Sequence, residues 1–206
     1  MPGASSPPRY MIYLIRHGQT EGNAARVVQT PDTPLSDHGQ WQARQLGARL
    51  ASVGLRRILS SDYHRACQTA AALSPTGDIP IDSLAILRER GLSGLAGRPY
   101  EDVEHFFYGP ACDATDCEPW VEFRTRVASL WTHVTEVASE HDGPVAVVTH
   151  GLVCRALAEF HLQPTPGEAP LDWFVNASLT EIEPRPPWTV RLAGCTAHLE
   201  DERQSQ

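Results

Sequence analysis

Two histidines follow apolar segments of the chain and precede a glycine. The first lies in Arg16-His17-Gly18, after Tyr13-Leu14-Ile15, and the second in His150-Gly151, after residues 145–149. Because the carboxyl ends of parallel strands meet at one edge of an open sheet, both imidazoles can reach a common site there. An arginine beside an imidazole favours its neutral, nucleophilic form, and a guanidinium can bind two phosphate oxygens. The pattern favours a catalytic site that binds phosphate.

A further arginine belongs to this candidate site. Arg65 lies in the first turn of a helix expected after Ser60-Ser61-Asp62, with Ser61 or Asp62 as its cap. The amino end of a helix favours anions, and His150 stands at a similar turn from strand to helix. Each residue also has an ordinary alternative, as a structural histidine at a strand end or as a surface arginine.

Strands alternate with helices along most of the chain, which predicts an α/β fold. We expect a three-layer α/β/α sandwich around a mostly parallel mixed sheet, with an antiparallel pair at its edge. The expected strands are 10–15 (central), 57–59, 79–81 (edge), 145–149, 174–183 and 188–192. The expected helices begin at Ser36, at Ser61 or Asp62, at Glu118-Pro119 and at Leu152, and the first three end before Gly54, at Ser74-Pro75 and before Gly143-Pro144.

The length of 206 residues fits one domain. We expect that domain to span residues 10–199, between a flexible leader at 1–9 and a flexible tail at 200–206. The periodic pattern breaks after Ser83 into segments rich in glycine and aromatic residues, which predicts a lid-like insert around residues 91–120.

The net charge of −8 disfavours nonspecific binding to nucleic acid or to anionic membranes. All 17 basic residues are arginine, which excludes Schiff-base lysine chemistry, pyridoxal phosphate attachment and a phosphate-loop lysine. The sequence holds neither a secretory signal nor the run of about 18 apolar residues that spans a bilayer. We therefore expect a cytoplasmic location. A homodimer is compatible with the sequence, which does not predict the oligomeric state.

The five cysteines are scattered, without the paired spacing of a zinc site or a disulfide scaffold. Free or buried thiols are expected. Cys112 and Cys117 are close enough in the chain to bridge a loop under oxidation.

Taken together, the motifs resemble those of the histidine phosphatase superfamily, the phosphoglycerate mutase-like group. The resemblance spans residues 10 to about 199. It rests on Leu14-Ile15-Arg16-His17-Gly18-Gln19-Thr20 with Asn23, on Ser60-Ser61-Asp62 with Arg65-Ala66 and Gln68-Thr69-Ala70, on Leu87-Arg88-Glu89, on Val148-Thr149-His150-Gly151, and on the late segments Asn176-Ala177-Ser178 and Thr196-Ala197-His198-Leu199.

The resemblance implies a two-step phosphoryl transfer through a phosphohistidine. His17 matches the nucleophile and Glu89 the proton donor. The matching phosphate and substrate contacts are Arg16, Asn23, Arg65, His150 and Gly151. Fixed cationic donors can stabilise this transfer without a metal, so neither a metal nor another cofactor is implied.

Glu89 lies between Arg88 and Arg90, which could lower its pKa, whereas a nearby phosphate dianion would raise it. Other carboxylates, Glu21, Glu101, Asp102 and Glu104, compete for the same role, but only Glu89 occupies the matching motif. The chain departs from the family at Gly94-Leu95-Ala96-Gly97, where many relatives have an aromatic and an acidic residue. Small residues there would widen the pocket, and Phe106-Phe107-Tyr108 could cover a substrate or form an ordinary packed helix.

We expect a metal-independent phosphatase that acts on a small phosphorylated metabolite. A phosphoglycerate-type mutase shares the core residues, but relatives of that kind usually carry longer insertions and a lysine among their substrate contacts. A metal-dependent hydrolase that uses His17 and His150 as ligands, and a noncatalytic phosphate-binding domain, are weaker alternatives. The sequence does not identify the substrate.

Overall fold

The computed structural model describes residues 11–109, 117–140, 143–165, 167 and 174–204. Within them, one six-stranded sheet has the order β3-β2-β4-β1-β5-β6. The β1, β2, β3 and β4 strands pair in parallel, whereas β5 is antiparallel to both β1 and β6, so the predicted mixed sheet is confirmed. The strands are β1 (Ile12–Arg16), β2 (Arg57–Ser60), β3 (Ile81–Ser83), β4 (Val145–Thr149), β5 (Leu179–Ile182) and β6 (Val190–Cys195).

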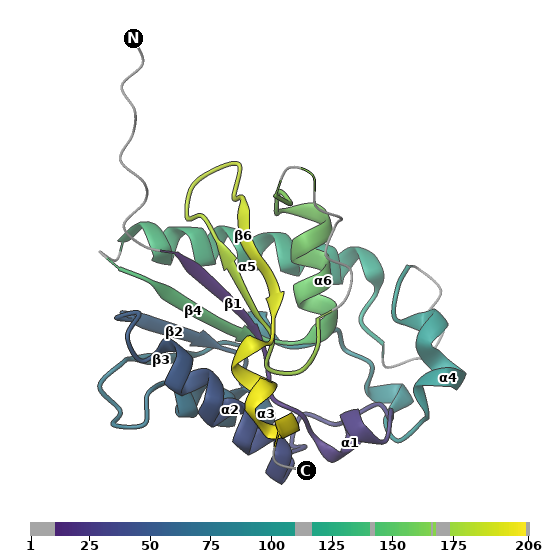
Figure 1. The fold of residues 1–206 in the computed structure, drawn as a ribbon. Helices are drawn as coiled ribbons and strands as arrows, with labels where there is room; N and C mark the ends of the chain where they lie inside the picture. The colour runs from purple at the N-terminus through teal and green to yellow at the C-terminus, as the bar shows by residue number, and fades with distance from the viewer. Residues whose placement is uncertain (1–10, 110–116, 141–142, 166, 168–173, 205–206) are drawn as a thin grey trace.

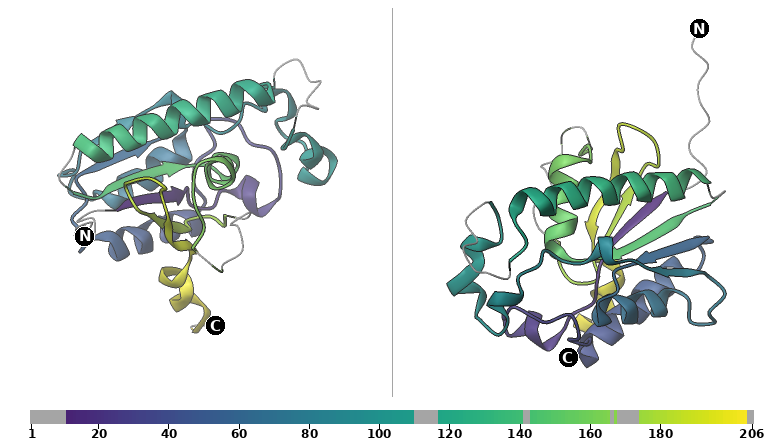
Figure 2. Two further views of the ribbon diagram at one scale, coloured as in Figure 1. Left: turned by 90° about the horizontal axis from the view of Figure 1, so that it is seen from above. Right: turned by 180° about the vertical axis from the view of Figure 1, so that it is seen from behind.

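Helices cover both faces of the sheet, as Figures 1 and 2 show. One face carries α2 (Asp37–Leu50) and α3 (His64–Leu73), and the other carries α5 (Trp120–Glu140) and α6 (Gly151–Phe160). Alternate residues of the central strands enter two separate cores. Ile12 and Leu14 pack in the core of α5 and α6, whereas Tyr13 and Ile15 pack in the core of α2 and α3. The three-layer α/β/α architecture is therefore confirmed.

The register of the parallel strands sets the level at which the chain leaves the sheet. Arg16 of β1 is paired with Thr149 of β4, and the N–H of His17 donates to the Thr149 carbonyl at 3.0 Å. On the other side of β4, the N–H of Ser61 donates to the Val148 carbonyl at 2.9 Å. As a result, residues 17, 61 and 150 begin their loops at one edge of the sheet.

The turn after β1 packs closely against the first turn of α2. A Cβ atom at Gly18 would lie 2.6 Å from the Gly39 carbonyl oxygen, and a Cβ at Gly39 would lie 1.8 Å from the Gln19 carbonyl oxygen. The Gly18 N–H also donates to the Thr69 hydroxyl of α3 at 3.1 Å. Both glycines are therefore required for this approach, which fixes the backbone next to His17.

Short elements gather beyond the carboxyl ends of the strands. A small core of Val28, Leu95 and Val103 joins the segment after α1 to the insert, and the Val28 N–H donates to the Arg98 carbonyl at 3.0 Å. The irregular stretch after residue 83 is confirmed, although it contains short helical turns. These elements are α1 (Glu21–Ala24), η1 (Ala85–Leu87), η2 (Ser93–Leu95), α4 (Tyr100–Val103) and η3 (Glu104–Phe106).

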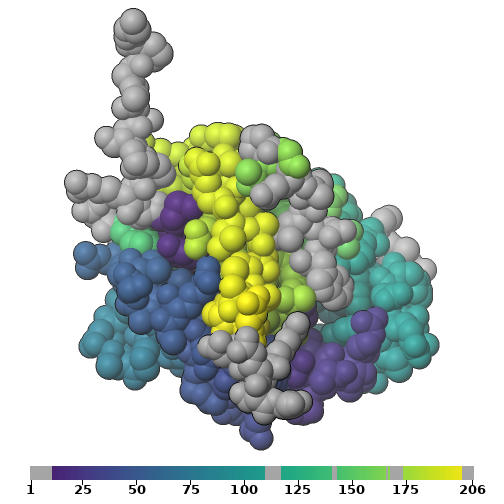
Figure 3. Space-filling model, in the orientation of Figure 1, coloured from purple at the N-terminus to yellow at the C-terminus, as the bar shows by residue number. Residues whose placement is uncertain are grey.

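The structure differs from the sequence predictions at several element boundaries. The last two strands are 179–182 and 190–195 rather than 174–183 and 188–192, because the turns before each take up part of the predicted strand or shift it along the chain. Helix α3 begins at His64 and has no side-chain cap, because the Ser61 hydroxyl bonds elsewhere. The edge strand is 81–83 rather than 79–81. The last helical segment is η4 (Ala197–Gln204), and Figure 3 shows it with β6, in yellow, across one face of the molecule.

Two further predictions concern the cysteines and the membrane. Cys67, Cys154 and Cys195 are free thiols, as expected, and Cys117 is disulfide-bonded. Cys112 lies outside the described residues. No helix in the part of the chain that the structure describes has the length and apolar character needed to span a bilayer.

Candidate active site

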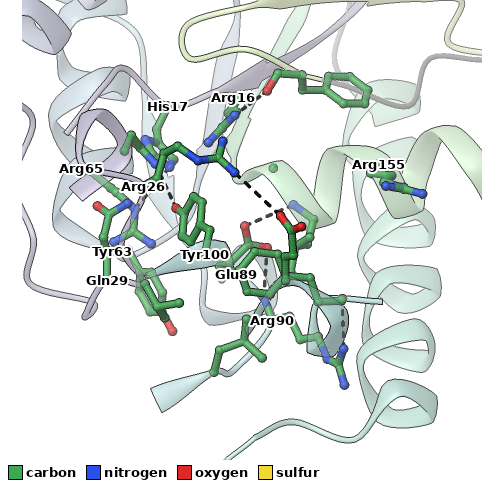
Figure 4. A pocket seen from close by; sticks show the side chains of 18 of the residues that line it. Arg16, His17, Arg26, Gln29, Tyr63, Arg65, Glu89, Arg90, Tyr100 and Arg155 are labelled. Carbon is green, nitrogen blue, oxygen red and sulfur yellow. Dashed lines mark hydrogen bonds and ion pairs between the residues drawn. The ribbon is translucent and has the colours of Figure 1, made fainter. Parts of the chain in front are cut away.

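A cavity of about 510 Å³ opens beyond the carboxyl ends of β1 and β4 (Figure 4). Most of the residues that the sequence singled out meet there. Arg16, His17, Asn23, Arg65, Glu89 and Gly151 line it. His150 is not among the lining residues, but its ring packs against that of His17, with the two centroids 5.1 Å apart.

The hydrogen bonds of His17 define its tautomer. Its buried ring lies between the Gly18 carbonyl, 2.7 Å from Nδ1, and the guanidinium of Arg65, whose Nε donates to Nε2 at 3.2 Å. Nδ1 must therefore carry the proton, and Nε2 keeps its lone pair. Burial first, and then the charges of Arg65 and Arg16, hold the pKa of His17 well below its usual 6.5. The imidazole is therefore neutral, with the Nε2 lone pair accepting the Arg65 N–H.

Two guanidiniums flank this nitrogen. Arg65 is fixed on α3, and a terminal nitrogen of its guanidinium donates to the Thr30 carbonyl at 2.9 Å. Arg16 donates to the Phe174 carbonyl, while its Nε is buried without a partner among the described residues. Gly151 lies against Arg16, since a Cβ there would be 3.5 Å from the guanidinium carbon. These cations leave N–H groups free for an anion beside His17.

His150 is positioned by Ser61, whose hydroxyl lies 2.8 Å from His150 Nε2. Ser61 Oγ also accepts the Tyr63 N–H at 3.3 Å. Because its proton has no other acceptor among the described residues, we infer that it is donated to Nε2. This assigns the proton of His150 to Nδ1, which is buried without a partner within the described residues. Burial, followed by the influence of His17, Arg65 and Arg16, holds the pKa of His150 well below 6.5.

Glu89 is partly buried and is held by two backbone donors. Its two oxygens accept the Arg90 N–H at 3.0 Å and the Leu152 N–H at 3.1 Å. Burial nevertheless raises the pKa of this carboxyl above its usual 4.5, as a general acid requires. The flanking guanidiniums have other partners, because Arg88 pairs with Asp62 and Arg90 donates to carbonyls of the insert. Burial outweighs the two N–H bonds and the charges of Arg65 and Arg16, all of which act to lower the pKa of Glu89.

Asn23 lies in α1, in the segment that follows His17, and lines the cavity. It forms a reciprocal capping box with Thr20 at the start of α1. Its side-chain oxygen also accepts from Asn176 at 3.1 Å, and Asn176 donates to the His17 carbonyl at 3.1 Å. The Asn23 amide nitrogen faces the cavity, with the Tyr100 hydroxyl at 3.5 Å.

Several supporting residues were not assigned these tasks from the sequence. Ser61, Thr69 and Asn176 lie in the matching motifs, which is the signal that could have pointed to them. Arg126 has no such signal, yet it donates to the Ile86, Arg88 and Glu89 carbonyls and pairs with Glu118. It therefore holds the loop that carries Glu89. No group of three His, Cys, Asp or Glu side chains able to hold a metal ion occurs among the described residues.

Comparisons with known proteins agree with the fold. The model of the histidine phosphatase superfamily (branch 1) matches residues 12–192. A probable phosphoglycerate mutase, GpmB of Proteus mirabilis, is 30% identical over 92% of this chain and 95% of its own length. A broad-specificity phosphatase of Saccharomyces cerevisiae is 29% identical over 92% of this chain and 87% of its own. Among solved structures, YhfR of Bacillus stearothermophilus has a TM-score of 0.76 and 29% identity, and covers 93% of this chain and 100% of its own.

Substitution Ser61→Ala tests how His150 is held. Loss of the hydroxyl leaves Nε2 unsatisfied in a buried site, so we expect the His150 tautomer to change and vanadate binding to weaken about 10-fold. Nitrogen NMR of the imidazole reports the tautomer directly, which a loss of packing alone would not alter. Exposed Ser129→Ala on α5 is the matched control. An unchanged His150 tautomer in Ser61→Ala would contradict this role.

The pKa shifts predict how stability depends on pH. Below pH 6.5 the unfolded chain takes up protons at His17 and His150 that the folded protein excludes. The free energy of unfolding should therefore fall with falling pH, with a slope for each histidine that approaches about 1.4 kcal/mol per unit below pH 6.5. Urea unfolding between pH 7.5 and 5.0 measures this slope. His17→Gln should reduce it, and Glu89→Gln should steepen it, because the raised pKa of Glu89 acts in the opposite sense above pH 4.5. Equal slopes in all three proteins would refute the assignment.

Proposed function

The chain belongs to the histidine phosphatase superfamily, and we propose that it is a metal-independent phosphatase that hydrolyses a small phosphorylated metabolite through a phosphohistidine on His17. The observation that supports this most directly is the state of the His17 ring. Nε2 is unprotonated, faces the cavity and has Arg65 at 3.2 Å. The nitrogen that would attack phosphorus therefore lies next to the guanidinium of Arg65, which would bind the phosphate oxygens.

The first step transfers the phosphoryl group to the enzyme. His17 Nε2 attacks phosphorus, the bond from phosphorus to the ester oxygen breaks, and Glu89 gives its proton to the departing alcohol. Arg16, Arg65 and Nδ1–H of His150 stabilise the charge on the equatorial oxygens. Burial of Glu89 favours the protonated acid that this step consumes.

The second step returns the enzyme to its starting state. Water attacks phosphorus and gives a proton to the Glu89 carboxylate, while the bond from Nε2 to phosphorus breaks and inorganic phosphate leaves. In both steps Arg16, Arg65 and His150 stabilise the phosphoryl oxygens. The proposed mechanism therefore needs no cofactor.

Both phosphatases and mutases are named among the relatives of this chain, so the second step separates the candidate activities. A mutase would return the phosphoryl group to a related metabolite rather than to water. The absence of lysine favours the phosphatase, whereas length does not separate the two, because this chain covers 95% of the probable phosphoglycerate mutase GpmB. The aromatic side chains of the cavity also suit an organic body larger than phosphoglycerate.

We expect His17→Ala to abolish phosphate release in a screen of phosphorylated metabolites, with phosphoglycerate acceptors included to detect transfer. The wild-type protein should form a covalent adduct that is acid-labile and stable in alkali, with mass spectrometry placing it on His17. Activity should persist in the presence of a chelator. Normal turnover by His17→Ala, or transfer to an acceptor without phosphate release, would overturn the proposal.

Substitution Glu89→Gln tests the role of Glu89 as proton donor independently of the role of His17 as nucleophile. Because good leaving groups need no protonation, kcat/KM should fall by about 100-fold for alkyl phosphates and by much less for 4-nitrophenyl phosphate. Glu122→Gln, which changes an exposed carboxylate of α5 outside the cavity lining, is the control. Equal losses on both esters would assign the proton to another group.

A further inference from the structure

The outer part of the cavity is aromatic. Beyond the residues that surround His17, its walls include Tyr100, Phe107 and Tyr108, and the Tyr100 and Phe107 rings meet edge to face with centroids 5.3 Å apart. These side chains come from the insert, where the sequence departs from its relatives. A cavity of about 510 Å³ with such walls has room for a ring-bearing organic group next to the phosphate.

The same part of the cavity contains a cation that the phosphoryl chemistry does not use. The guanidinium of Arg155 lies over the Tyr108 ring, with its carbon 3.7 Å from the ring centroid. Stacking occupies the face of a guanidinium and leaves its N–H edge free to bind an anion. Within the described residues no ion pair involves Arg155. Arg26, which lines the same cavity, instead pairs with Glu104 at 3.7 Å.

The position of Arg155 separates it from the reacting phosphoryl group. Gly151 lies against Arg16, and Arg155 is four residues farther along α6, which is about 6 Å along the helix on the same side. In Figure 4, His17 and Arg65 lie at one side of the view, Glu89 in the middle, and Arg155 on α6 at the opposite side. An anion bound by Arg155 is therefore a second charged group of the substrate.

We propose that Arg155 binds a carboxylate, and that the substrates of this protein are phosphate monoesters of ring-bearing carboxylic acids. This inference rests on the proposed function, in which the phosphate of the substrate lies at His17. The ring lies among Tyr100, Phe107 and Tyr108, and the carboxylate accepts the free N–H edge of Arg155. The bond that breaks remains the ester bond at phosphorus, so the carboxylate contributes to selection and takes no part in the chemistry.

The test compares two esters with the same leaving group, the O-phosphate of 3-(4-hydroxyphenyl)propanoate and its primary amide. The wild-type protein should favour the acid by at least about 10-fold in kcat/KM, the effect of one charge-assisted hydrogen bond. Arg155→Gln should reduce this ratio to about one. Arg124→Gln is the matched control, because Arg124 also stacks on a ring, that of Phe160 at 4.1 Å, but does not line the cavity. It should keep the wild-type ratio.

Inert difluoromethylphosphonate analogues of the acid and the amide separate this inference from the proposed function. Their dissociation constants, measured by calorimetry, should show the same ratio and the same loss in Arg155→Gln. Binding that follows this pattern without release of phosphate from the esters would overturn the phosphatase and support the subsite. Phosphate release from both esters at equal kcat/KM, or an acid preference that Arg155→Gln retains, would overturn the subsite and leave the phosphatase standing.

Discussion

The active site depends on the parallel pairing of β1 with β4, which the His17 N–H extends by one bond to the Thr149 carbonyl. That bond brings His17 and His150 out of the sheet at the same level. A shift of one residue would turn every side chain of β1 to the opposite face, and both cores of the sandwich prevent it. Packing on the two faces of the sheet therefore fixes the relative positions of His17 and His150.

Burial then sets the charges within that geometry. Both histidines are held neutral and the pKa of Glu89 is raised, so the arginines supply the charge that the site presents to a ligand. The Nε of Arg16 is buried without a partner among the described residues, so an anion bound there would compensate a poorly hydrated charge. Because the fold fixes these groups before a ligand binds, the proposed transfer needs little reorganisation.

The features that could be predicted from the sequence are those that depend on local patterns of residues. Apolar runs located the central strands, and the residues after them located His17 and Arg65. The start of α3 was misplaced because the Ser61 hydroxyl bonds to His150, far away in the chain, rather than to the helix. The environment of Glu89 could not be derived from its neighbours, since Arg88 and Arg90 turn toward distant partners. The support from Arg126 joins segments that only the tertiary fold brings together.

Arg90 has a consequence for how this protein could diverge. Its buried guanidinium donates to the Phe106, Phe107 and Glu118 carbonyls, so one side chain attaches the middle and the end of the insert to the backbone next to Glu89. These acceptors are backbone atoms, which any amino acid supplies. Insert side chains that line the cavity, such as Tyr108, can thus change while the Arg90 contacts and the Glu118–Arg126 pair still hold the backbone next to Glu89. New substrate preferences can arise in this scaffold without rebuilding its chemistry.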